Sequence, residues 1–244
     1  MLASKIDAHE ADFNANKTDA QGDKYDFQID NSRGFPLAYL TSKGGISGFF
    51  YPENSAKDLI VLHFTCGFLK GDIATLVEQD SHMSTHFILG RNGVAYQLFN
   101  TNYWSYHLGK GSMGGNTPNS KRSVAIEISN IGPLILKGST LTDVYGGAYC
   151  DFSDFQYYQK LDIPWRGYQY YATFTDVQYT SLKAMLTFLC GKWSIPKVFV
   201  PEASRFEIFA DANTACSYKG IATHANFRAD GKVDIGTAFN WEKI

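Results

Sequence analysis

The sequence predicts an α/β fold, in which a β-sheet is flanked by helices, and three observations support this prediction. Residues 59–65 begin with a short apolar run rich in β-branched side chains, which is typical of a buried strand. Residues 176–191 place apolar side chains at helical spacing. Residues 198–200 and 220–224 then predict an edge strand and a further strand. With 244 residues and 44% apolar content, the chain can bury the core of one such domain.

The first 33 residues are predicted to be an extension of this domain. They hold seven acidic and four basic residues and few large apolar ones, so we expect a solvated arm or a short helix that caps the domain. Residues 1–20 lack the apolar stretch of a secretory signal peptide. The chain has no run of 18 apolar residues, so no membrane-spanning helix is expected. We therefore expect a protein made as a soluble cytoplasmic chain.

A histidine follows directly on the first predicted strand. His63 comes at the polar end of the apolar run, just before a loop that contains Cys66 and Gly67. A lone histidine of this kind is more often a satisfied core residue than a ligand. At the end of a rigid strand, however, its side chain can face a cleft. After the loop, an aspartate cap at Asp72 and apolar residues at helical spacing predict a helix over residues 71–78.

The last part of the chain has the layout of a catalytic metal loop. His224 is followed by Lys232 eight residues later and by Asp234 ten residues later. An imidazole and a carboxylate suit Zn²⁺, and a catalytic zinc ion usually takes three protein ligands and leaves its fourth position to water. His63 is the best candidate for the third ligand.

The helix predicted over residues 176–191 has a clear start. Thr175 and Gln178 form a capping box, in which each side chain bonds the other residue's backbone N–H. The helix should end near Gly191. Its apolar face is formed by Leu182, Met185, Leu186 and Leu189.

Residues 131–174 are longer than a simple connection in a compact domain should be, and we interpret them as an insertion. Aromatic faces can stack on sugars or line a peptide groove, but they also fill the core of a subdomain, and both alternatives remain open. The insertion contains eleven aromatic residues: Tyr145, Tyr149, Phe152, Phe155, Tyr157, Tyr158, Trp165, Tyr168, Tyr170, Tyr171 and Phe174.

The overall charge and the cysteines exclude some classes of function. A formal net charge of −2 and a pI near 6.3 give no global attraction to nucleic acid or to an anionic membrane. The four cysteines form no Cys-x-x-Cys pair, so neither a zinc knuckle nor a redox dithiol is indicated. We expect all four to be buried thiols.

Five segments resemble, in the same order, motifs of the type 2 N-acetylmuramoyl-L-alanine amidases. These are zinc peptidoglycan amidases that share a fold with peptidoglycan-recognition proteins. The segments are residues 63–65, 84–98, 106–109, 123–128 and 223–241. The resemblance covers residues 59–130 and 176–241. It implies a central mixed β-sheet flanked by helices, with one amidase domain over residues 34–244, an N-terminal extension over 1–33 and an aromatic-rich insertion over 131–174.

The resemblance also implies a site and a reaction. It identifies His63, His224 and Asp234 as ligands of a Zn²⁺ cofactor. It makes Glu127 the general acid and base, and Lys232 the cation that stabilises the oxyanion. The implied substrate is peptidoglycan or a muropeptide, cut at the amide bond between N-acetylmuramic acid and L-alanine of the stem peptide.

Four further positions carry expectations from the same motifs. Thr85 stands where eukaryotic-type relatives have a tyrosine beside the zinc, and we treat it and His107 as candidate substrate contacts. For His107, a structural role in its loop is the alternative. His86 is expected to pack against or orient its neighbours. Ile235 replaces a proline that usually follows the aspartate, which predicts a looser loop.

The pair Glu127 and Lys232 is typical of the bacterial branch of the family and favours a bacterial or phage enzyme. Three settings then fit: muropeptide recycling in the cytoplasm, lysis by a phage endolysin, or attack by a secreted antibacterial effector. A non-catalytic peptidoglycan-binding module and a structural or virion component are the alternatives from other classes. We expect a monomer.

Overall fold

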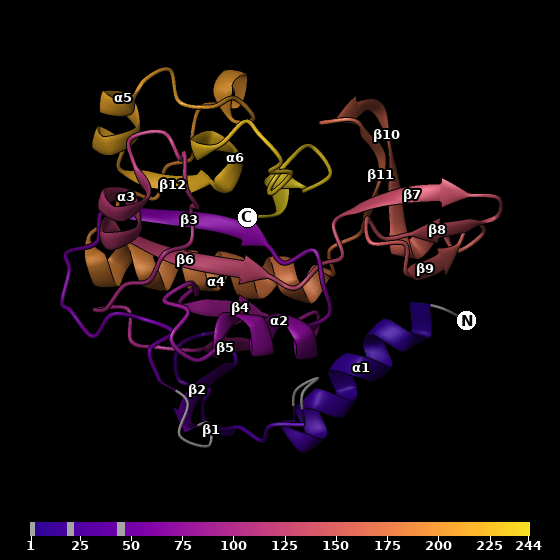
Figure 1. The fold of residues 1–244 in the computed structure, drawn as a ribbon, viewed down its shortest axis with the longest axis horizontal. Helices are drawn as coiled ribbons and strands as arrows, with labels where there is room; N and C mark the ends of the chain where they lie inside the picture. The colour runs from indigo at the N-terminus through magenta and orange to yellow at the C-terminus, as the bar shows by residue number, and fades with distance from the viewer. Residues whose placement is uncertain (1–2, 19–21, 43–46) are drawn as a thin grey trace.

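The structure is a computed structural model that describes residues 3–18, 22–42 and 47–244. A seven-stranded sheet forms the body, and a separate five-stranded sheet lies beside it (Figure 1). The strands of the larger sheet lie in the order β1-β2-β5-β4-β6-β3-β12. Their bounds are β1 Asp26–Asp30, β2 Leu37–Ser42, β3 Leu59–Phe64, β4 Phe87–Leu89, β5 Ala95–Gln97, β6 Ser123–Ile128 and β12 Gly220–Thr223.

The larger sheet is mixed. Its strands β12, β3, β6 and β4 run parallel to one another, β4 and β5 are antiparallel, and β2 is parallel to β5. Strands β3 and β6 are buried along most of their length, which explains their nearly continuous apolar sequences. The predicted central mixed sheet flanked by helices is confirmed.

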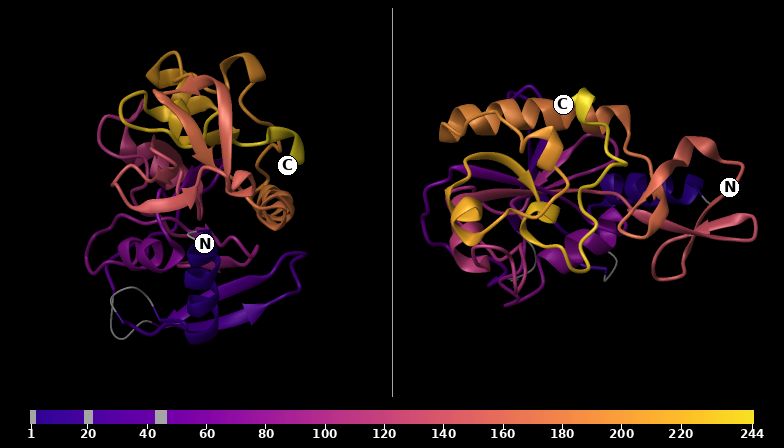
Figure 2. Two further views of the ribbon diagram at one scale, coloured as in Figure 1. Left: turned by 90° about the vertical axis from the view of Figure 1, so that its right-hand side faces the viewer. Right: turned by 90° about the horizontal axis from the view of Figure 1, so that it is seen from above.

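Helices cover both faces of the larger sheet (Figures 1 and 2). Helix α4 packs against the face that carries Ile60 and Leu62 of β3. The alternate residues of the same strand, Leu59 and Val61, face the opposite way and pack near α5 and α6. The helices are α1 Ala3–Asn16, α2 Leu69–Leu76, α3 Asn116–Arg122, α4 Asp176–Trp193, α5 Ala212–Ser217 and α6 His224–Phe227, with 3-10 turns at η1 Phe155–Tyr157, η2 Glu202–Ser204 and η3 Trp241–Lys243.

Two predicted helices differ in how well their starts were predicted. The capping box of α4 is present, because the Thr175 hydroxyl accepts from the Gln178 backbone N–H and the Gln178 side chain accepts from the Thr175 N–H. The aspartate cap of α2 was wrong. That helix begins at Leu69, its N-cap is Phe68 without a side-chain hydrogen bond, and Asp72 lies in the first turn.

The edge strand predicted over residues 198–200 is also wrong. Only an isolated parallel bridge between Phe199 and Ile221 forms there, so β12 is the outer strand on this side. Pro196 and Pro201 flank the segment. Proline cannot donate to a strand ladder, which limits how far the pairing can extend.

The N-terminal segment packs against the body. Phe13 of α1 is fully buried in a core cluster with Tyr25 and Tyr96. Glu10 of the same helix accepts a hydrogen bond from the backbone N–H of Asn92 at 3.0 Å. Strand β1 adds to the edge of the larger sheet. No helix in the described ranges is long and apolar enough to cross a membrane.

The smaller sheet is formed by the insertion, in the order β10-β11-β7-β8-β9 with antiparallel neighbours. Tyr149, Tyr158 and Tyr171 are buried, so these aromatic side chains fill a core, whereas Tyr145 is 82% exposed. Core packing is therefore confirmed for these three residues, and substrate contact stays a prediction for exposed ones such as Tyr145. Its strands are β7 Pro133–Lys137, β8 Thr140–Thr142, β9 Ala148–Asp151, β10 Tyr158–Trp165 and β11 Tyr168–Ala172.

All four cysteines are free thiols, but they are not all buried. Cys150 and Cys190 are buried, Cys66 is half-buried and Cys216 is exposed. The prediction of four buried thiols was therefore wrong for Cys66 and Cys216.

Candidate metal centre

Strand register brings the predicted histidines and Glu127 to one edge of the sheet. His63 on β3 is the Cα partner of Glu127 on the parallel strand β6. On the other side of β3, Thr223 of β12 is the partner of Leu62, so His224 follows directly beside His63. Because all three strands run in the same direction, their carboxyl ends present these side chains together, toward the side where the insertion lies (Figure 1).

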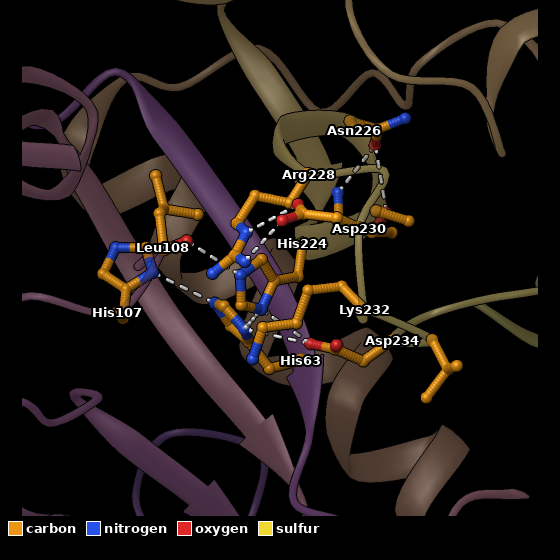
Figure 3. A network of polar contacts seen from close by, with 12 residues as sticks. His63, His107, Leu108, His224, Asn226, Arg228, Asp230, Lys232 and Asp234 are labelled. Atoms are coloured by element: carbon orange, nitrogen blue, oxygen red, sulfur yellow. Dashed lines mark hydrogen bonds and ion pairs between the residues drawn. The ribbon is translucent and has the colours of Figure 1, made fainter. Parts of the chain in front are cut away.

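His63, His224 and Asp234 form one buried group (Figure 3). The Nδ1 atoms of the two histidines are 3.0 Å apart. The Oδ2 atom of Asp234 lies 3.2 Å from Nδ1 of His63 and 3.0 Å from Nδ1 of His224. Three potential ligand atoms therefore face a common point.

The contacts on the far side of His224 set its tautomer. Its Nε2 lies 3.0 Å from the carbonyl oxygen of Leu108, and a carbonyl can only accept a hydrogen bond. Nε2 must therefore carry the proton. In the neutral ring, Nδ1 then presents a lone pair to the group of three.

A chain of hydrogen bonds sets the tautomer of His63 in the same way. The Ser123 hydroxyl donates to the carbonyl of Ser120, so its oxygen accepts from Nε2 of His107 at 2.7 Å. His107 Nδ1 is then left as an acceptor, and it receives the proton on Nε2 of His63 at 3.0 Å. His63 Nδ1 consequently also presents a lone pair to the group. Residues 107 and 108 thus orient both histidines.

This arrangement fits a divalent cation. Two imidazole lone pairs and a carboxylate oxygen face one another, and buried acceptors without a donor are costly. Burial lowers the pKa of His63 to about 4, so the His63 ring is neutral near neutral pH. Ligand atoms bound to tetrahedral zinc lie roughly 3.3 Å apart, close to the spacing observed.

Glu127 lies beside this group and is a candidate acid or base. Its Oε2 atom is buried and makes no hydrogen bond to any described residue. Burial raises the pKa of the Glu127 carboxyl well above its usual value, with further contributions from Asp234 and Asp72, while Lys232 opposes the rise. A carboxyl with a raised pKa and a free oxygen can exchange protons with a bound molecule.

Two hollows meet at this edge of the sheet. One has a volume of about 610 Å³ and extends toward the insertion, where Tyr145, Arg166 and Tyr168 line it. The other has a volume of about 490 Å³ and a largely apolar lining, with Leu76 and Met83 on its wall. The residues shared by both hollows are His107, Glu127, His224 and Lys232.

The structure brings the predicted site residues together, with two different outcomes for the substrate-contact candidates. Thr85 lines the apolar hollow, but its buried hydroxyl donates to the carbonyl of Phe87 at 3.2 Å. His107 also lines the hollows, yet both of its ring nitrogens are already hydrogen-bonded. The orienting roles of Ser123 and Leu108 could not be predicted, because a serine and a backbone carbonyl give no sequence signal of ligand orientation.

His86 is buried and bonded on both sides. Its Nδ1 accepts from the backbone N–H of Ala125 at 3.0 Å, and its Nε2 lies 3.1 Å from the carbonyl of Tyr103. The ring therefore ties β6 to the loop that follows β5, as expected for a residue that orients its neighbours.

Comparison with known proteins supports a family assignment. Residues 53–236 match the family described as N-acetylmuramoyl-L-alanine amidase. No protein with a curated description matches the chain.

Two solved structures are among those to which the chain is similar. The first is the N-acetylmuramyl-L-alanine amidase AmiD from E. coli, a complex with anhydro-N-acetylmuramic acid-L-Ala-D-gamma-Glu-L-Lys, at 19% identity and a TM-score of 0.48 over 88% of this chain. This chain spans 63% of that protein's length. The second is the endolysin LysCS from Clostridium intestinale, at 14% identity and a TM-score of 0.44 over 85% of this chain and 91% of the other.

We predict that His107→Phe weakens metal binding. The phenyl ring keeps much of the volume but cannot accept the proton of His63 Nε2, so that imidazole loses its fixed orientation. The dissociation constant for Zn²⁺, measured by competition with a chromophoric chelator, should rise roughly 10–100-fold. His82→Phe is the matched control, because His82 stacks on Tyr51 and does not contact the group of three. Equal affinities of both variants and the unaltered protein would contradict the proposed orientation.

Proposed function

The chain belongs to the N-acetylmuramoyl-L-alanine amidase family, and from this premise we propose that it hydrolyses the amide bond between N-acetylmuramic acid and L-alanine of peptidoglycan stem peptides. One observation supports the proposal most strongly. The acceptor group of His63, His224 and Asp234 lies at the sheet edge beside the half-buried Glu127, whose buried Oε2 atom has no hydrogen-bond partner among the described residues. This combination suits metal-assisted hydrolysis of an amide.

The proposed cofactor is Zn²⁺, held by Nδ1 of His63, Nδ1 of His224 and Oδ2 of Asp234. Two nitrogens and one carboxylate oxygen are a typical donor set for catalytic zinc. When bound, the ion would polarise the scissile carbonyl and lower the pKa of a water molecule at its open position. The chain's own contribution is to hold the three ligand atoms in place through Leu108 and His107.

Glu127 is the proposed general acid and base. It takes a proton from the attacking water and passes a proton to the leaving amine of L-alanine. This role needs a pKa that is not far below the working pH, since a weakly basic carboxylate takes protons poorly. The raised pKa of the Glu127 carboxyl meets this need.

Lys232 is the proposed electrostatic partner of the oxyanion. It lines both hollows, and Figure 3 shows its side chain extending toward the group of three. A fixed cation beside an oxygen that gains negative charge stabilises the transition state more than the ground state. The exposed side chain of Asp230 is paired with Arg228 on the same loop, which leaves the Lys232 ammonium for the substrate.

The two hollows suit a substrate that has a sugar part and a peptide part. Glu127 and Lys232 stand where the hollows meet, so a scissile bond bound there would have one part of the substrate in each. Thr85 in the apolar hollow remains a candidate contact through its methyl group. For His107, the two ring hydrogen bonds favour a positioning role over a substrate contact.

The products test the proposed bond. Digestion of purified peptidoglycan should release stem peptides that begin with a free L-alanine amino group, and the glycan strands should stay uncut. Mass spectrometry of the soluble fraction measures both. New reducing sugar ends would indicate a glycosidase, and new amino termini at D-amino acids would indicate an endopeptidase; either result contradicts the amidase assignment.

Glu127→Gln separates proton transfer from metal binding. The variant should keep one zinc ion per chain, because Glu127 is not a proposed ligand, while its kcat should fall roughly 100-fold or more. Glu78→Gln is the matched control, since Glu78 is an exposed carboxylate on the wall of the apolar hollow. Loss of zinc from Glu127→Gln would make Glu127 a ligand and overturn the assignment of its role.

A further inference from the structure

The loop that carries Lys232 and Asp234 has no regular secondary structure of its own. It runs from the end of α6 at Phe227 to the short turn at Trp241. Its backbone makes two hydrogen bonds to α6: the Arg228 N–H donates to the His224 carbonyl at 3.1 Å, and the Asp234 carbonyl accepts from the Ala225 N–H at 2.8 Å. The side chain of Asp234 is nevertheless buried. Something outside the loop must hold its backbone.

The tip of the β10–β11 hairpin reaches this loop from the insertion. Strands β10 and β11 are joined by Arg166 and Gly167, and their φ angles of 45° and 87° are both positive, as in a tight two-residue hairpin turn. The turn projects the neighbouring side chains of Trp165 and Arg166 away from the insertion. Both contact the loop that follows α6.

Arg166 binds three backbone carbonyls of that part of the chain. Its Nη1 donates to the carbonyl of Arg228 at 3.0 Å and also to that of Lys232, and its Nη2 lies 3.5 Å from the carbonyl of Ala225. The planar guanidinium presents several donors in a rigid fork, so one side chain can fix several points of a loop. These bonds hold the backbone at and before Lys232, and they do not involve its ammonium group.

Trp165 fixes the next part of the loop. Its indole Nε1 donates to the carbonyl of Val233 at 3.1 Å, directly before Asp234. The ring rests on Gly236, where any Cβ would overlap the indole nitrogen. Trp165 is in turn held by the hydroxyl of Tyr171, which donates to the Trp165 carbonyl at 2.8 Å.

We propose that Trp165 and Arg166 are positioning residues for Lys232 and Asp234, so that the insertion braces the catalytic loop in addition to lining the substrate cleft. The four carbonyl contacts lie at residues 225, 228, 232 and 233, on both sides of Lys232 and next to Asp234. The brace supplies contacts to the part of the loop in which Ile235 stands in place of the proline that the resemblance leads one to expect. Ile235 itself is fully buried in the core.

The proposal rests on the proposed function for the identity of the metal site, and a metal titration tests it without any substrate. Arg166→Met should raise the dissociation constant for Zn²⁺ roughly 10–100-fold, because outer contacts of ligands are typically worth that factor. Arg166→Lys should show a loss of similar size, since an ammonium keeps the charge but cannot span three carbonyls. Trp165→Phe should weaken binding less, because it removes one hydrogen bond and keeps part of the ring.

Kinetics at saturating zinc separates positioning from substrate binding. For Arg166→Met we expect a lower kcat with KM within about twofold, as for a misplaced group that acts in the transition state. The double variant of Trp165 and Arg166 should lose less than the product of the two single losses, because both side chains hold the same loop. Ile163→Ala is the matched control, since Ile163 lies on β10 and is 82% exposed.

Three outcomes overturn the proposal. Unchanged zinc affinity and kcat with a raised KM would make Arg166 a substrate contact. A lower melting temperature with unchanged zinc affinity and kcat would make the hairpin contacts purely structural. A fully retained zinc affinity in Arg166→Lys would show that charge, and not the three carbonyl bonds, is what matters. If the unaltered protein binds no zinc, the proposed function fails instead, and this result is distinguishable from the other three.

Discussion

The rest of this structure depends on three hydrogen-bond acceptor atoms that face one another. Nδ1 of His63, Nδ1 of His224 and Oδ2 of Asp234 lie within 3.2 Å of each other in a buried place. Their outer contacts leave lone pairs, and not protons, on the inner side. Such a group needs a positive charge at its centre, because buried lone pairs without a partner are unfavourable. The strands and loops around this group hold the three atoms at that spacing.

Different parts of the chain hold each of the three atoms. Parallel strands fix the two histidines through register, because β3 lies between β6 and β12 and all three end at the same edge. The loop at His107 and Leu108 then sets the orientation of both rings. Asp234 lies on an irregular loop that strand register does not fix, and α6 holds it through one backbone bond, from the Ala225 N–H to the Asp234 carbonyl. The hairpin of the insertion supplies the missing contacts through Trp165 and Arg166.

The sequence predicted those features that depend on local patterns or on ordered motifs. The apolar run before His63, the capping box at Thr175 and the spacing of His224, Lys232 and Asp234 all lie within short stretches, so the sequence alone is enough to infer their chemistry. The three metal ligands could be assigned together because the motifs that contain them occur in the same order as in the amidase family. The wrong predictions at Asp72 and over residues 198–200 have the opposite cause, since tertiary packing decided where α2 began and how far the sheet extended.

The contacts of the hairpin tip with the catalytic loop, and the contacts that orient the two histidines, could not be predicted in this way. Arg166 lies 59 to 66 residues from the carbonyls that it binds, and Ser123 acts on His63 only through a second histidine. Neither relation leaves a periodic or compositional signal. The aromatic content of the insertion suggested packing or substrate contact, whereas the part that reaches the catalytic loop is a hairpin tip with one tryptophan and one arginine.

X-ray absorption spectroscopy of the zinc-loaded protein tests the central claim most directly. Two imidazoles and a carboxylate predict a first shell of nitrogen and oxygen atoms at about 2.0–2.1 Å, with the outer-shell scattering of two histidine rings. Cys66 lies on the wall of the same cleft and is the rival ligand. A sulfur atom at about 2.3 Å, or scattering from a single imidazole, would contradict the assignment of His63, His224 and Asp234 as the metal ligands.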